Sequence, residues 1–136
     1  MSNCKTQNKE QPTLKLFHNS TVIFTSTKKW LYPLFDLESF LKDYLTHHPE
    51  ATSDLYLEDK IVGKASAFLI VYMGIPKVHA HILSSYGKKV FETYSIQYTY
   101  DTLIERVSCK TEELLKNVRA PKEAYRIIQN LRNNNT

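Results

Sequence analysis

The segment from Ile61 to Ile75 is long enough for a helix and is apolar almost all the way round. From Ala65 to Met73 only Ser66 interrupts the apolar side chains. A helix without a polar face has to be covered on all sides by other elements. The run is also far shorter than the roughly 20 residues that span a bilayer. We therefore expect a helix buried in the core of a globular domain, ended by Gly74 and Pro76.

The rest of the chain alternates strand-like and helix-like patterns. Two short strands joined by His18-Asn19-Ser20 predict a hairpin at the start. Helices between strands act as crossovers, so the later strands are expected to be parallel neighbours. This order predicts a three-layer α/β/α sandwich. The expected elements are strands at Leu14–Phe17, Thr21–Thr25, Ser53–Glu58, Lys77–Leu83 and Ile96–Tyr100, and helices from Asp36 to His48, Ile61 to Ile75, Ser84 or Ser85 to Tyr94, from Asp101 or Thr102, around Ser108 to Leu115, and from Lys122 to Leu131.

Length and charge limit the domain organisation and the partners. The 136 residues fit a single core, expected at 13–131 between an N-terminal tail (1–12) and a polar C-terminal tail (132–136). The net charge of +4 divides into +4 for residues 1–30, −2 for 31–100 and +2 for 101–136. The expected core is thus slightly acidic, which argues against a nucleic-acid groove. Without an apolar leader or membrane span, a cytoplasmic protein with free thiols is expected.

Two stretches resemble a known family. They are Asp59-Lys60-Ile61-Val62-Gly63-Lys64-Ala65 with the buried helix after it, and Val78-His79-Ala80-His81-Ile82-Leu83-Ser84. Together they are similar to a prokaryotic domain-of-unknown-function family that adopts the cytidine deaminase-like fold. The similarity runs from about Leu14 to Leu115. It implies a five-stranded mixed sheet flanked by helices.

The resemblance does not extend to zinc-dependent deamination. Zinc deaminases need a His or Cys ligand followed two residues later by Glu at the start of one helix, and Pro-Cys-x-x-Cys at the next. Here the corresponding helices begin with Gly63-Lys64-Ala65 and near Ser84-Ser85. No zinc deaminase and no cofactor are therefore expected. His79 and His81 face the same side of a strand and could bind one metal ion, but two ligands are too few without a third from the fold.

The turn from Asp59 to Lys64 is the expected binding site. A glycine, a lysine and the free N–H groups of a helix start all favour an anion there. Asp59 and Lys60 precede the turn at the carboxyl edge of the sheet, where ligands bind in open α/β folds. Ser84 and Ser85, at the start of the next helix, complete the expected ligand-binding set. The alternative is that Gly63 only permits a tight turn and that Lys64 pairs with Asp59.

The sequence thus predicts a small anionic or nucleotide-like ligand, with two alternatives. One is an interaction module in which apolar surface around Trp30, Tyr32 and Phe35 binds another chain or a second copy. The other is an enzyme that uses Cys109, because a cysteine in the first turn of a helix has a lowered pKa. No histidine lies close to Cys109 in the sequence to act as its base.

Overall fold

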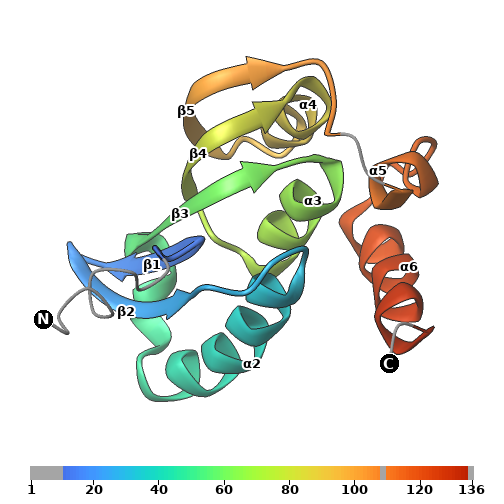
Figure 1. The fold of residues 1–136 in the computed structure, drawn as a ribbon. Coiled ribbons are helices and arrows are strands. Elements are labelled where there is room, and N and C mark those ends of the chain that lie inside the picture. The colour runs from blue at the N-terminus through green and yellow to red at the C-terminus, as the bar shows by residue number, and fades with distance from the viewer. Residues whose placement is uncertain (1–10, 108–109, 135–136) are drawn as a thin grey trace, which may run out of the picture.

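The chain forms a mixed five-stranded sheet with helices packed against it (Figure 1). The computed structural model describes residues 11–107 and 110–134. The strand order is β2-β1-β3-β4-β5, in which β1 is antiparallel to β2 and β3, while β3, β4 and β5 are parallel. The strands are β1 (Leu14–His18), β2 (Thr21–Ser26), β3 (Leu55–Val62), β4 (Lys77–Ser84) and β5 (Gln97–Ile104). The predicted mixed sheet and its parallel strands are confirmed.

The opening hairpin is closed by Asn19 and Ser20. Both have positive φ, 51° and 75°, as the two central residues of a type I′ turn require. The register between β1 and β2 shifts between Leu16 and Phe17, so β2 carries an irregularity. The hairpin predicted from His18-Asn19-Ser20 is confirmed.

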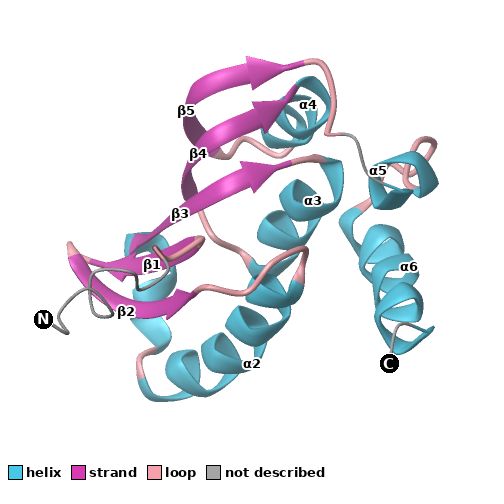
Figure 2. Ribbon diagram, in the orientation of Figure 1, coloured by secondary structure: helices cyan, strands magenta, loops and turns pink. Residues whose placement is uncertain are grey.

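The helices lie on one face of the sheet (Figure 2). Three of them, α2 (Tyr32–His47), α3 (Lys64–Met73) and α4 (Ser85–Thr93), connect successive strands. The last helix, α6 (Pro121–Asn134), packs on α3. Two short helices are also described: η1 (Pro49–Asp54) lies between α2 and β3, and α5 (Lys110–Leu114) lies between β5 and α6. Within residues 11–107 and 110–134, no helix covers the opposite face. The described layers are therefore the sheet, then α2, α3 and α4, then α6, which differs from the predicted α/β/α order with helices on both faces of the sheet.

The core lies between the sheet and α3. In the first parts of β1, β3 and β4 every second side chain is buried against the helices; beyond Asp59 and Ala80 the alternation ends, with Ile61 exposed and Val62 and Leu83 buried. These inward residues include Leu14, Leu16, Leu55, Leu57, Val78 and Ala80. In α3 all residues from Ala65 to Ile70 are buried, because α2, α4 and α6 surround the helix. The prediction of a buried helix is confirmed from Ala65 to Ile70, whereas Tyr72 in the last turn is 41% exposed.

Three predicted boundaries are wrong. The first helix begins at Tyr32, with Pro33 in its first turn, and not after Asp36. Strand β3 continues to Val62, so α3 begins at Lys64 and not at Ile61. Strand β5 continues to Ile104, where Ile104 pairs with Ser84 of β4, so the helix predicted from Asp101 or Thr102 does not form. In each case strand pairing or a proline outweighs the local helical pattern.

Candidate functional site

The expected anion site at the start of α3 is filled by a carboxylate of the chain itself. Gly63 precedes the helix, and the backbone N–H of Lys64 donates to Oε2 of Glu112 at 2.6 Å. Glu112 lies in α5 and is 5% exposed. A negative charge at a helix N-terminus is stabilised by the free N–H groups and the helix dipole. The anion at this helix start is therefore the Glu112 carboxylate of the chain itself, from a residue 48 positions later in the sequence.

Glu112 joins three parts of the structure. Its Oε1 accepts the backbone N–H of Val107 at 2.7 Å, and its Oε2 also accepts the hydroxyl of Ser84 at 3.3 Å. Ser84 in turn caps α4 by accepting the N–H of Gly87 at 2.9 Å. The carboxylate thereby connects the first turn of α3, the cap of α4 and the segment after β5.

Gly63 is required by this arrangement for space and not for its backbone angles. Its φ of −103° and ψ of −164° are extended and open to any residue. A Cβ at this position would lie 2.6 Å from Oε2 of Glu112 and 3.1 Å from Cγ2 of Val107. Glycine thus allows the carboxylate to approach the helix start.

The side chain of Lys64 lies along α3. Its ammonium donates to the carbonyl of Lys116 at 3.0 Å and lies 5.9 Å from the ring centroid of Phe68. Burial lowers the pKa of Lys64; Glu112 opposes this shift, while the charges of Arg119 and Lys89 add to it. In the described part of the chain Lys64 does not pair with Asp59, which was the alternative from the sequence.

A cavity of about 220 Å³ opens beside this turn. We call it the Gly63 cavity. Its mainly apolar walls come from β3, α3, α5, the segment after β5 and the segment before α2. The lining residues are Trp30, Leu31, Ile61, Gly63, Lys64, Ala65, Ser66, Val107, Thr111 and Glu112.

Trp30 stands out among these residues because of its backbone. Its φ is +58°, a conformation that costs energy for a bulky residue. The indole N–H donates to Oγ1 of Thr111 at 3.1 Å, and the side chain remains 37% exposed. Tyr32 and Phe35 meet the indole edge to face, with ring centroids 5.2 and 5.7 Å away. The surrounding contacts therefore hold an aromatic ring in the wall of the cavity.

The aromatic group proposed as an interaction surface is mostly covered. Phe35 is 2% exposed and lies under the guanidinium of Arg132, 4.5 Å from its ring centroid. Tyr32 is partly buried against the core. Of the three aromatic residues, only Trp30 is exposed.

Asp59 and Lys60 line a different cavity. Both lie within β3, and their cavity of about 260 Å³ extends to Thr13 and His81. Asp59 is 8% exposed, and burial raises the pKa of its carboxyl to about 7, against a smaller lowering effect of the Lys60 backbone N–H. The residues predicted for one site are thus divided between two.

The two serines also separate. Ser84 is fully buried and reaches the Gly63 cavity through Glu112, whereas Ser85 donates to the carbonyl of Ile104 at 3.3 Å. The structure therefore brings together Gly63, Lys64 and Ser84 of the predicted set. Glu112, Trp30 and Thr111 join them.

His79 and His81 lie on the sheet face without described helices. Both bind the carboxylate of Asp101, His79 through Nε2 at 3.2 Å and His81 through Nδ1 at 2.8 Å. Nδ1 of His79 also lies 2.6 Å from the hydroxyl of Thr99. Among residues 11–107 and 110–134, no group of three or more His, Cys, Asp or Glu side chains is placed to hold a metal ion. Cys109 lies outside the described residues.

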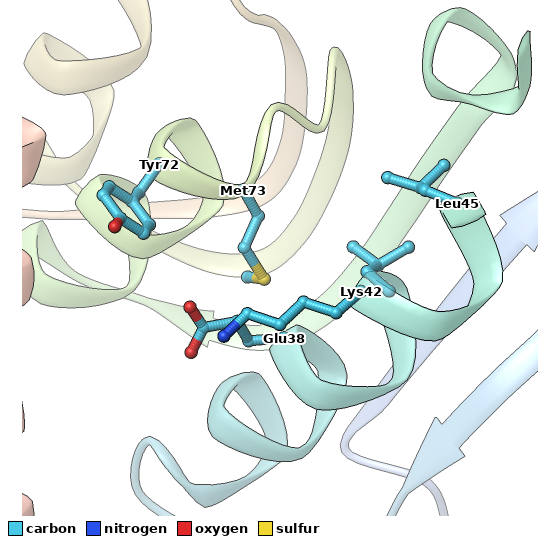
Figure 3. Close-up of a pocket in the computed structure, with 6 residues that line it drawn as sticks. Glu38, Lys42, Leu45, Tyr72 and Met73 are labelled. Atoms are coloured by element: carbon cyan, nitrogen blue, oxygen red, sulfur yellow. The ribbon is translucent and has the colours of Figure 1, made fainter. Parts of the chain in front are cut away.

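A further cavity of about 210 Å³ lies between α2 and α3 (Figure 3). It is lined by Glu38, Leu41, Lys42, Leu45, Tyr72 and Met73. Tyr72 stacks on Tyr125 of α6 with ring centroids 4.1 Å apart, and the Tyr125 hydroxyl donates to Glu38 at 3.0 Å. These contacts make the cavity part of the packing between three helices.

The comparisons with known proteins place the chain in a family. Residues 4–131 match the family described as TM1506, domain of unknown function (DUF1893). The crystal structure of a DUF1893 family protein (TM1506) from Thermotoga maritima is similar, with a TM-score of 0.74 and 24% identity over 95% of this chain and 86% of that one. No curated protein matches. No described helix is long and apolar enough to cross a membrane. The chain therefore belongs to the DUF1893 family.

Proposed function

We propose that the protein binds a small anionic molecule with a nucleobase-like ring in the Gly63 cavity. The observation that carries this proposal is Trp30, an exposed indole held at positive φ in the cavity wall. Residues in costly conformations persist where the surroundings impose them, and they concentrate at ligand sites. The indole offers a flat surface on which a ring can stack.

Glu112 supplies a hydrogen-bond acceptor for such a ring. A carboxylate has about four acceptor positions. Three are used by Lys64, Ser84 and Val107, two of them on Oε2 and one on Oε1. In this proposal the remaining position on Oε1 accepts a ring N–H or amino group of the ligand.

The size and charge of the site restrict the ligand further. A cavity of about 220 Å³ is smaller than the roughly 300–1,000 Å³ that enclose drug-sized ligands, so it fits one ring system. The helix N-terminus is occupied by Glu112, so an anionic group would be bound by side chains instead. Lys64, with Lys89 and Arg119 close enough to affect its pKa, supplies the positive charge.

The proposal includes a cytidine deaminase-like fold without deaminase chemistry. The alternation of strands and helices and the sheet order β2-β1-β3-β4-β5 support that architecture. The starts of α3 and α4 carry Gly63-Lys64-Ala65 and Ser85-Tyr86, and neither segment contains a zinc ligand of the deaminase pattern. The site is proposed to bind its ligand without zinc.

A thermal-shift screen of ring-containing phosphates and carboxylates tests the proposal. A ligand at about 100 times its dissociation constant stabilises the folded state by about 2.7 kcal/mol. Lys64→Met, which keeps packing over Phe68 but removes the charge, should weaken a ligand found in this way. Lys60→Met, outside the cavity, is the matched control and should not. If no compound raises the melting temperature, or if both variants bind equally well, the proposal is wrong.

A further inference from the structure

Strand β5 is an edge of the sheet with little protection. It has eight residues, all exposed or half-buried, and pairs with β4 without a register shift. Edge strands are normally protected from pairing with other chains by charges, prolines, bulges or short length. The other edge, β2, is shorter, with six residues and an irregular register. Strand β5 contains no proline and one charged residue, Asp101.

The charge of Asp101 is directed away from this edge. Its carboxylate oxygens lie 3.2 Å from Nε2 of His79 and 2.8 Å from Nδ1 of His81, both on the neighbouring strand β4. These contacts hold the side chain toward the interior of the sheet. The one charge of β5 therefore does not protect the outer side of the strand.

The backbone pattern identifies which groups of β5 face outward. The N–H of Gln97 donates to the carbonyl of Pro76, and the carbonyl of Glu105, just after β5, accepts from Ser85. Along a strand, alternate residues direct both backbone groups to the same side. The odd-numbered residues of β5 therefore bond to β4. The N–H and C=O groups of Tyr98, Tyr100 and Thr102 face outward.

From this edge we infer that β5 pairs with β5 of a second copy of the chain, antiparallel and with Tyr100 opposite Tyr100. In a continuous antiparallel sheet, residues opposite each other have their side chains on the same face. The two-fold axis of the dimer must therefore place a residue opposite its own copy, and not opposite the copy of the next residue. Centred on Tyr100, the outward groups of Tyr100 bond their copies, and Tyr98 bonds Thr102 in both directions. The pairing centred on Asp101 would place two carboxylates opposite each other, at about 4.5 Å between Cα atoms.

The side chains fit the same register. Tyr100 and Leu103, which are 39% and 40% exposed, would be covered across the seam. Tyr98 and Tyr100 already stack on the helix-bearing face, with ring centroids 6.5 Å apart. Thr99 would lie opposite Asp101 of the other chain, so this register brings no two carboxylates opposite each other. A contact built on one strand pair is small, so the dimer should depend on concentration.

Sedimentation equilibrium from low to several hundred micromolar tests the dimer. Thr102→Pro removes an outward N–H while leaving the bonds to β4, a position where edge strands tolerate proline. It should raise the dissociation constant of the dimer about tenfold or more, because two symmetry-related hydrogen bonds are lost. Thr102→Val keeps the N–H and serves as the matched control. A monomer at every concentration, or equal effects of the two variants, overturns the inference.

Disulfide cross-linking tests the register. In a background with both native cysteines replaced by serine, Tyr100→Cys places two thiols across the two-fold axis, with Cα atoms about 5.5 Å apart. This variant should form a covalent dimer under mild oxidation. Thr102→Cys lies on the same outer edge, but its copy would be four residues out of register. Cross-linking of both variants at equal rates, or of neither, overturns this register.

Discussion

Replacing Gly63 by alanine is expected to destabilise the protein through one specific contact. The added methyl group would lie 2.6 Å from Oε2 of Glu112, a distance that nonbonded carbon and oxygen atoms do not tolerate. The backbone angles at this position suit alanine, so strain in φ contributes nothing. The carboxylate has to move away, and its hydrogen bond to the Lys64 N–H weakens or breaks.

The size of the effect follows from the contacts of the carboxylate. A hydrogen bond to a charged group is worth about 1.5–3 kcal/mol, whereas Gly→Ala at compatible angles stabilises by about 0.4–1 kcal/mol through the unfolded chain. Gly63→Ala should therefore cost about 1–2 kcal/mol of unfolding free energy. Glu112→Ala leaves three donors without their acceptor and should cost about 3 kcal/mol.

The double variant separates this explanation from a general effect of the methyl group. Once Glu112 is alanine, the close contact disappears, and only the 3.1 Å approach to Val107 remains for the new methyl group. Gly63→Ala should then be nearly neutral, which gives a coupling free energy of about 1–2 kcal/mol.

Urea unfolding of the four proteins, followed by circular dichroism, measures this cycle. The slopes of the unfolding transitions should agree if folding remains two-state. Additivity of the two substitutions within about 0.5 kcal/mol would refute the reasoning, because it would mean that Gly63 and Glu112 do not meet in the folded protein.

Three further predictions concern titration, metal and thiol chemistry. Burial raises the pKa of Asp59 from 3.8 to about 7 on folding. Between these two pH values the unfolded chain has released this proton and the folded chain still holds it. The free energy of unfolding should therefore fall as pH rises, by about 1.4 kcal/mol per pH unit over that interval. Asp59→Asn should remove this decline in unfolding experiments at several pH values; an unchanged profile would contradict the shift. Elemental analysis of protein purified without chelator should find well under one zinc per chain, and a full equivalent lost on His79→Ala or His81→Ala would contradict this. Cys109 should alkylate near neutral pH no faster than Cys4; a much faster reaction would support a reactive thiolate.

The elements that the sequence predicts well are those with strong local patterns. The apolar run of α3 and the Asn19-Ser20 turn carry their structure in a few consecutive residues. The local pattern does not predict the end of β5, because Asp101 and Thr102 favour a helix start. Their strand conformation follows from pairing with β4, which the local pattern does not contain.

The candidate site could be predicted only in part for a related reason. Gly63 and Lys64 indicate an anion at the start of α3, because the free N–H groups of a helix N-terminus favour an anion in any fold. The anion is Glu112, and no spacing rule connects residues 48 positions apart. Trp30 reaches the same cavity only because the segment before α2 lies beside α5, where it bonds Thr111. The local sequence indicates that an anionic group binds at this helix start, and the tertiary fold determines which residue supplies it.

The chain has a single tryptophan, and its position allows its fluorescence to report on the Gly63 cavity. The indole bonds Thr111, adjacent to Glu112, so its emission depends on the packing of α5 against the start of α3. Separation of α5 from α3 should shift the emission maximum to longer wavelength, because water reaches the indole ring. A molecule stacked on the indole should instead quench its fluorescence. Both events can thus be followed and distinguished in the unlabelled protein.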